Sequence, residues 1–166
     1  MLVEDNRSDP FAAPPADRPV HRVLVAFDGS AGAWAALAQA IEIARSRRAT
    51  LTIAAVVDEA PSLCVGLSPI VIPYSREAMC REAEGEMLRV LAAARDSIPA
   101  DLPVTTRLLH GRPARVLAKL AEDDRCDLVV TGPPGAGRLR ALLGGGVTRG
   151  LLARCGSSVL AVRAPA

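Results

Sequence analysis

The chain has 166 residues and a mass of 17.3 kDa, which suits a single domain. Half of its residues are apolar and 23% are charged, so most of the chain is expected to fold. Twenty basic and eighteen acidic residues give a formal charge of +2, too balanced for wholesale binding to a phosphate backbone. One Trp, one Tyr and two Phe are too few aromatics to stack single-stranded bases, so we expect no nucleic-acid partner.

Membrane and metal partners are not expected either. No apolar run approaches the ~20 residues that a membrane-spanning helix needs, and the N-terminus lacks the basic and apolar regions of a secretory signal. The four cysteines (Cys64, Cys80, Cys126 and Cys155) are widely spaced and form no Cys-x-x-Cys pair. This spacing favours reduced thiols and excludes a structural metal site, so we expect a cytoplasmic protein.

The first part of the chain divides into a tail, a strand and a helix. Residues 1–20 are polar and rich in proline, which predicts a flexible N-terminal tail ahead of a domain over 21–166. Residues 21–27 predict a buried strand that runs into the turn Asp28-Gly29-Ser30. Helical spacing follows over 31–48. The predicted apolar stripe of this helix is Trp34, Leu37, Ala38, Ile41 and Ala44.

The rest of the chain repeats the alternation of strand and helix. The further strands are predicted at 51–57, 103–109, 127–131 and 158–162, with helices near 75–97, from Pro113, and near 147–154. Segment 61–74 is broken by prolines and predicts a loop over the domain. Continuous apolar strands that alternate with amphipathic helices indicate an α/β fold. We expect a doubly wound, open parallel sheet of five strands with helices on both faces.

Polar residues follow several of the predicted strands. Ligands of such sheets bind beyond the carboxyl ends of the strands, where the strand order reverses. Asp28, Asp58 and the loop that begins at Gly132 are placed at this edge. The carboxylate of Asp28 suits paired sugar hydroxyls, but it equally suits a turn or a helix cap. The sequence leaves both interpretations open.

The loop over 132–146 is rich in glycine and leads from a strand to a short helix. Backbone N–H groups freed by glycine, near a helix start, favour an anion, and residues 128–166 hold five arginines and no acid. Alternatively the glycines permit tight turns and the arginines are solvated. A P-loop is excluded because Arg138 and Leu139 follow Gly137, where that motif needs Lys and Ser or Thr.

Four segments together resemble the universal stress protein family over about residues 20–164. They are VLVAFDGS at 23–30, AAVVDE at 54–59, HGRPARVLAKLAEDDRCDLVVTG at 110–132, and the glycine-rich loop. Nucleotide-binding members of this family carry G-x2-G-x9-G followed by Ser, Thr or Asn. Gly132, Gly135 and Gly145 satisfy the three glycine positions. The chain therefore resembles the nucleotide-binding subgroup, with departures in the glycine motif.

The resemblance implies ATP as the ligand, and Mg²⁺ could accompany it. It implies adenine against the backbone near Val56, the ribose near Asp28, and the phosphates within the glycine-rich loop and the helix start that follows. The nucleotide-binding candidates are Ala26, Asp28, Val56, Thr131, Gly132, Gly135, Gly145, Gly146, Val147 and Thr148.

Two departures from the family motif weaken the implied phosphate contacts. Gly146 stands where the family has a hydroxyl or an amide, which removes one hydrogen bond worth on the order of 1 kcal/mol. Pro133 and Pro134 remove two backbone donors from the loop. Arg138, Arg140 and the extra glycine amides are the candidates for compensation.

The resemblance implies a cytoplasmic stress-response protein, a nucleotide-dependent regulatory homodimer with at most slow hydrolysis. The dimer would form through the C-terminal strand near Ser158–Arg163, which we predict to be an edge strand open to pairing. The alternative is a nucleotide-independent dimeric scaffold of the same fold, although the intact glycine spacing favours the nucleotide. His21 and His110 alone assemble no Ser/His/Asp grouping, so no catalytic residues are predicted.

Overall fold

The computed structural model describes residues 19–58, 73–133 and 146–163, and the bulk of the predicted tail, of the 61–74 loop and of the glycine-rich loop lies outside them. The described elements confirm the predicted alternation, and their ends fall within two residues of the predicted ones. In chain order they are β1 (Arg22–Ala26), α1 (Ala31–Arg47), β2 (Thr50–Val57), α2 (Pro73–Asp96), β3 (Val104–His110), α3 (Pro113–Asp123), β4 (Leu128–Thr131), α4 (Gly146–Leu152) and β5 (Ser158–Ala161).

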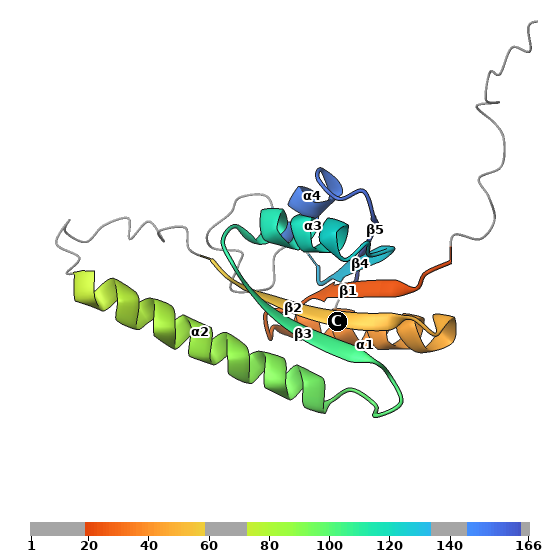
Figure 1. Cartoon of the computed structure of the whole chain (residues 1–166), viewed down its shortest axis with the longest axis horizontal. Coiled ribbons are helices and arrows are strands. Elements are labelled where there is room, and N and C mark those ends of the chain that lie inside the picture. Colours follow the sequence, from red (N-terminus) through yellow and green to blue (C-terminus); the bar gives the residue numbers. More distant parts are fainter. Residues whose placement is uncertain (1–18, 59–72, 134–145, 164–166) are drawn as a thin grey trace, which may run out of the picture.

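The strands form one parallel sheet in the order β3-β2-β1-β4-β5 (Figure 1). The chain proceeds outward from β1 to β3, then returns to the other side of β1 to form β4 and β5. The strand order therefore reverses between β1 and β4. The predicted parallel five-stranded sheet is confirmed, and β5 lies at its edge as expected.

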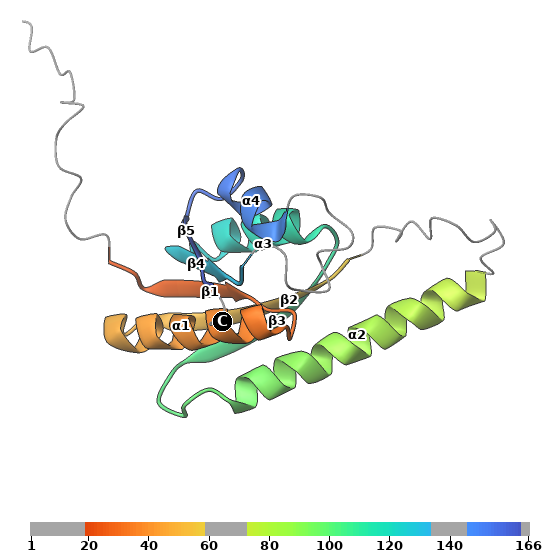
Figure 2. The same ribbon diagram turned by 180° about the vertical axis from the view of Figure 1, so that it is seen from behind.

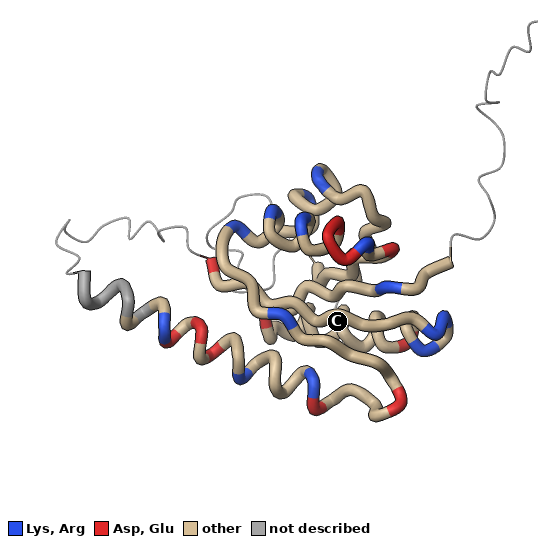
Figure 3. Tube along the Cα trace, viewed as in Figure 1, with Lys and Arg blue, Asp and Glu red and all other residues tan. Residues whose placement is uncertain are grey.

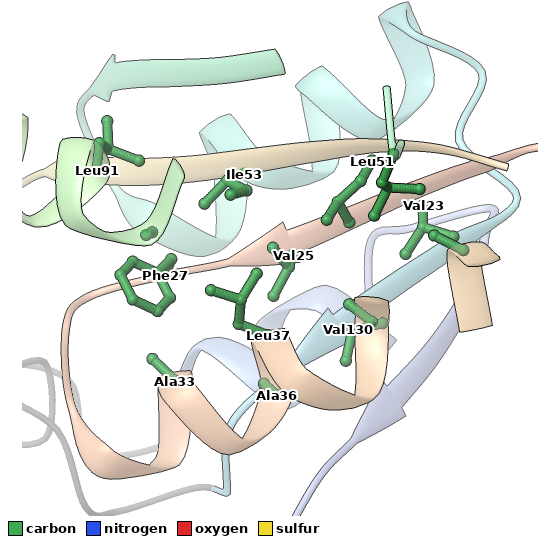
Figure 4. Packing of buried hydrophobic residues seen from close by; sticks show 14 of the residues in the cluster. Val23, Val25, Phe27, Ala33, Ala36, Leu37, Leu51, Ile53, Leu91 and Val130 are labelled. Atoms are coloured by element: carbon green, nitrogen blue, oxygen red, sulfur yellow. The ribbon is translucent and has the colours of Figure 1, made fainter. Parts of the chain in front are cut away.

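Helices cover both faces of the sheet. α1 and α2 lie on one face, and α3 and α4 lie on the other (Figures 1 and 2). On the first face, Val23 and Val25 of β1, Leu51 and Ile53 of β2 and Leu37 of α1 belong to one cluster of buried side chains between the sheet and the helix (Figure 4). The alternate residues of the same strands supply the second core, which is closed by α3 and α4. Because the central strands are buried on both faces, their sequences read as continuous apolar runs.

The buried face of α1 differs from the predicted stripe. Trp34 is 38% exposed, and Ala38 is also exposed. The side chains that α1 buries are Ala33, Ala36, Leu37, Ala40 and Ala44. Small alanine side chains let the helix lie close to the sheet, whereas the indole of Trp34 packs edge-on against Phe27, with ring centroids 5.0 Å apart. Leu37 and Ala44 are buried as predicted and Ile41 packs against the core, so the prediction was wrong for Trp34 and Ala38.

Two helices end on an arginine with a left-handed backbone. Arg48 follows α1 with a φ of 53°, and Arg125 follows the C-cap of α3 with a φ of 49°. Glycine is the residue that most often takes this position after a helix, because a Cβ there meets the neighbouring carbonyl oxygen.

We therefore expect Arg48→Gly to raise the free energy of unfolding by about 0.5–1 kcal/mol, since glycine adopts a positive φ without this steric cost. Arg47→Gly removes the neighbouring guanidinium from inside the last helical turn and should lower the free energy of unfolding by about 1 kcal/mol. Urea unfolding of both variants measures the difference. A lower free energy of unfolding in both variants would mean that the contacts of the Arg48 side chain stabilise the protein by more than its backbone strain costs.

Candidate functional site

The described candidate residues gather at the carboxyl edge of the sheet, around the reversal of strand order. β1 ends at Ala26 and leads to Asp28, and β4 ends at Thr131 and leads to Gly132. Val56 lies one residue before the end of β2, and Val147 and Thr148 lie in the first turn of α4, which begins at Gly146. Gly135 and Gly145 lie outside the described residues.

The turn after β1 is held by two side-chain contacts. Asp28 accepts a hydrogen bond from the Ser30 N–H through Oδ1, at 3.0 Å. Ser30 caps α1 by accepting from the Ala33 N–H at 3.1 Å. Asp28 therefore has the turn role that the sequence left open, and the cap is Ser30. Among the described residues Oδ2 of the partly buried Asp28 has no hydrogen-bond donor, so it remains able to accept from a ligand.

Gly132 lies directly against the first turn of α1. A Cβ on Gly132 would lie 2.8 Å from both the carbonyl carbon and the oxygen of Gly32, and one on Gly32 would lie 2.6 Å from Cδ of Pro133. Neither position has room for a side chain. Gly32 was not among the residues predicted for the site, although a glycine in the first turn of a helix is unfavourable and so signals a close backbone approach.

Two buried threonines connect β4 to α4. Oγ1 of Thr131 and Oγ1 of Thr148 lie 3.2 Å apart, and both side chains are nearly inaccessible to solvent. Oγ1 of Thr131 lies 3.1 Å from the Gly132 carbonyl oxygen, and Oγ1 of Thr148 lies 3.5 Å from it. Two hydroxyl protons can serve only two of these three contacts. The shorter distances favour Thr148 donating to Thr131, which in turn donates to Gly132.

The side chain of Thr148 therefore has an internal role. The resemblance implies that the start of α4 donates to a phosphate, which stays a prediction, and the structure shows that the hydroxyl of Thr148 is engaged with β4. A contact from this residue to a ligand is left to its backbone N–H.

Within residues 19–58, 73–133 and 146–163, no three His, Cys, Asp or Glu side chains gather in a way that could hold a metal ion. None of the helices in the described ranges is both long and apolar enough to cross a membrane. At the same edge, on the outermost strand β3, Nε2 of His110 lies 3.9 Å from Oε1 of Glu84 in α2.

The strand order and the helices on both faces define an open, doubly wound α/β protein. The family model of universal stress proteins matches residues 19–163, and the chain belongs to that family. It is 30% identical over 142 residues to a universal stress protein of Thermus aquaticus, covering 85% of this chain and 97% of the relative. It is also 31% identical over 165 residues to the stress response protein NhaX of Bacillus subtilis (strain 168), covering 86% and 97%.

Solved structures show the same fold. A universal stress protein in complex with cAMP is 25% identical, with a TM-score of 0.63 over 89% of this chain and 99% of that one. A family member from Arabidopsis thaliana with AMP bound has a TM-score of 0.64 at 17% identity, over 88% and 93% of the two chains.

The threonine pair can be tested by stability measurements. We expect Thr148→Val to lower the free energy of unfolding by about 1–2 kcal/mol, because it leaves a buried hydroxyl at Thr131 without its donor. Thr131→Val should lower the free energy of unfolding by a similar amount. The double variant should lose less than the sum of the two single losses, because both polar groups are then removed together. Urea unfolding of the cycle measures the coupling. Strictly additive losses would show that the two hydroxyls do not interact.

Proposed function

We propose that this universal stress protein binds an adenine nucleotide, with ATP as the first candidate, at the carboxyl edge of its sheet. It would act in the cytoplasm as a nucleotide-dependent regulatory protein, with at most slow hydrolysis. The proposal is supported above all by the position of Asp28 and Gly132 on either side of the point where the strand order reverses. Open α/β sheets bind their ligands at that point. The cAMP and AMP complexes of the two solved relatives add support for an adenine nucleotide.

The residues at this edge suggest separate roles for the two ends of the ligand. The backbone near Ala26 and Val56 would face adenine, and Oδ2 of Asp28 would accept from the ribose hydroxyls. On the phosphate side, Thr131 and Gly132 begin the segment that would hold the ligand, and Val147 and Thr148 would donate backbone N–H groups. Gly135, Gly145 and Gly146 belong to the proposal through the sequence motif. Mg²⁺ could accompany a triphosphate.

The phosphate side of the proposed site lacks several donors. Gly146 has no side chain, Pro133 and Pro134 have no N–H, and the hydroxyl of Thr148 is engaged with Thr131. The ribose contact, by contrast, rests on a turn whose hydrogen bonds are already made. We therefore expect the nucleoside to contribute more of the affinity than the phosphates.

Native mass spectrometry of the purified chain, followed by calorimetric titration with ATP and Mg²⁺, AMP and cAMP, tests this proposal. We expect Asp28→Asn to weaken nucleotide binding by about tenfold, because it removes a charged acceptor while retaining Oδ1 for Ser30. Gly135→Val and Gly145→Val should lower the affinity for ATP more than they lower the affinity for AMP. Asp123→Asn, at the far end of α3, is the matched control and should leave binding unchanged. A protein that ignores all three nucleotides would overturn the proposal.

A second candidate function is the nucleotide-independent dimeric scaffold, which is favoured by the open edge of β5. Ser158 and Val162 donate their N–H groups to Asp127 and Thr131 on the β4 side. By alternation, the N–H groups of Val159 and Ala161 point to the open edge, where a second copy could pair. We propose a homodimer through residues Ser158–Arg163 for either function.

Proline substitutions can test this edge. We expect Ala161→Pro to shift the protein from dimer to monomer in light scattering, because it removes a donor that only a partner strand would use. Leu160→Pro is the control: its N–H belongs to the β4 side, so it should destabilise the fold itself. A wild-type chain that is monomeric at micromolar concentration would contradict the dimer. A dimer that binds no nucleotide would favour the scaffold.

A further inference from the structure

A hollow of about 330 Å³ lies at the opposite edge of the sheet from the proposed nucleotide site. It is bounded by the end of α3 and by the segment between α4 and β5, so it faces the amino ends of the strands. Its volume is at the lower end of the ~300–1,000 Å³ typical of small-molecule pockets. The floor includes Ala118 and Ala121 of α3 and the buried side chain of Cys126.

Two arginines line this hollow. Arg125 has no ion pair and no side-chain hydrogen bond to any residue in the described ranges, and Arg154 directs only Nη1 to the Gly150 carbonyl, at 3.3 Å. Glu122 also lines the hollow, so the side chains around it carry a net charge of +1. Two guanidinium groups at one hollow repel each other, and an anion between them would remove that repulsion.

Arg125 is not required to end α3. The last turn is already capped by backbone groups, since the N–H of Cys126 donates to the Ala121 carbonyl at 2.7 Å and that of Arg125 donates to Glu122 at 3.0 Å. The positive φ of Arg125 favours glycine at this position. The chain therefore carries a guanidinium at a backbone position that favours a smaller residue.

The thiol of Cys126 adds no negative charge to the lining of the hollow. Burial, together with the nearby charge of Asp124, raises the pKa of the Cys126 thiol to about 11, so it is neutral at neutral pH. Ser157 donates its hydroxyl proton to the Cys126 carbonyl at 2.7 Å, which leaves the two guanidinium groups as the side-chain donors of the lining that are available to a ligand. The hollow is thus lined by two alanines and a neutral thiol together with the guanidinium groups of Arg125 and Arg154 and the carboxylate of Glu122.

We propose that this hollow binds a small organic anion, with a compact apolar body and one carboxylate or phosphate group held between Arg125 and Arg154. The two guanidinium forks match the oxygens of either head group, and the alanine floor accommodates the apolar body. The hollow lies at the opposite edge of the sheet from the proposed nucleotide site. The two proposals can therefore be tested independently of each other.

Amide chemical shifts of the ¹⁵N-labelled full chain provide the test, with titrations of inorganic phosphate, butyrate and butyramide. Saturable shifts at Gly156 and Ser157 are expected with butyrate or phosphate, without shifts at Thr131 and Thr148 across the sheet. Tighter binding of inorganic phosphate, which has no apolar body, would favour a phosphate head group, whereas tighter binding of butyrate would favour a carboxylate on an apolar body. Butyramide has the same body without the charge and should produce no saturable shift.

A matched pair of variants separates this site from general surface charge. Arg125→Gly and Arg48→Gly each remove an arginine from a left-handed position after a helix, so both should fold at least as well as the parent chain. Only Arg125→Gly and Arg154→Gln should lower the affinity for the anion, by at least about fivefold. Glu122→Gln should raise that affinity. No saturable shift with either anion, or an equal loss in Arg48→Gly, would overturn the proposal.

Discussion

The contact between the backbones of Gly32 and Gly132 is the constraint on which the carboxyl edge depends. It places the residue after β4 on the first turn of α1, with no room for a Cβ on either side. Since α1 begins only three residues after Asp28, the contact also sets how close the β1 turn lies to the start of the glycine-rich segment. A bulkier residue at 32 or 132 would separate these two parts. The geometry of the proposed site thus rests on two residues that present no functional side chain.

The two edges of the sheet differ in electrostatics because all of its strands are parallel. Helix starts, with their unpaired N–H groups, lie at the carboxyl edge, and helix ends lie at the amino edge. Cations near helix ends are favourable, which accounts for Arg45 and Arg47 in the last turn of α1. Figure 3 shows that charges of both signs are spread along α2 and around α3, so neither edge has a uniform charge. Arg125 and Arg154 differ from these because they line a hollow.

The sequence was sufficient to predict the order of elements and the edge position of β5, but not the packing of α1. Short apolar runs such as residues 23–27 and 51–57, each closed by a turn, indicated strands buried on both faces. The stripe through Trp34 and Ala38 failed because helical periodicity does not decide whether large or small side chains face a sheet. Gly32 could have been noticed as an unfavourable residue in a helix.

Contacts that depend on how distant elements pack together could not be predicted from the sequence. Whether Asp28 or Ser30 caps α1 depends on the path of the turn, and the two roles have the same sequence signature. Thr131 and Thr148 are 17 residues apart, and their pairing requires α4 to return to the end of β4. Arg125 and Arg154 come to one hollow only because α3 and α4 lie side by side with their ends at the same edge.

The state of the threonine pair also bears on what the proposed nucleotide site would respond to. With its side-chain hydroxyl engaged at Thr131, Thr148 ties the start of α4 to the end of β4 without the help of a ligand. The turn that would face the ribose is likewise formed in advance by the hydrogen bonds of Asp28 and Ser30. Interactions made in advance stabilise a ligand without the entropic cost of ordering the protein. A site of this kind would therefore respond chiefly to the adenosine shared by ATP and AMP, and discriminate between the two only through contacts from the segment after Gly132.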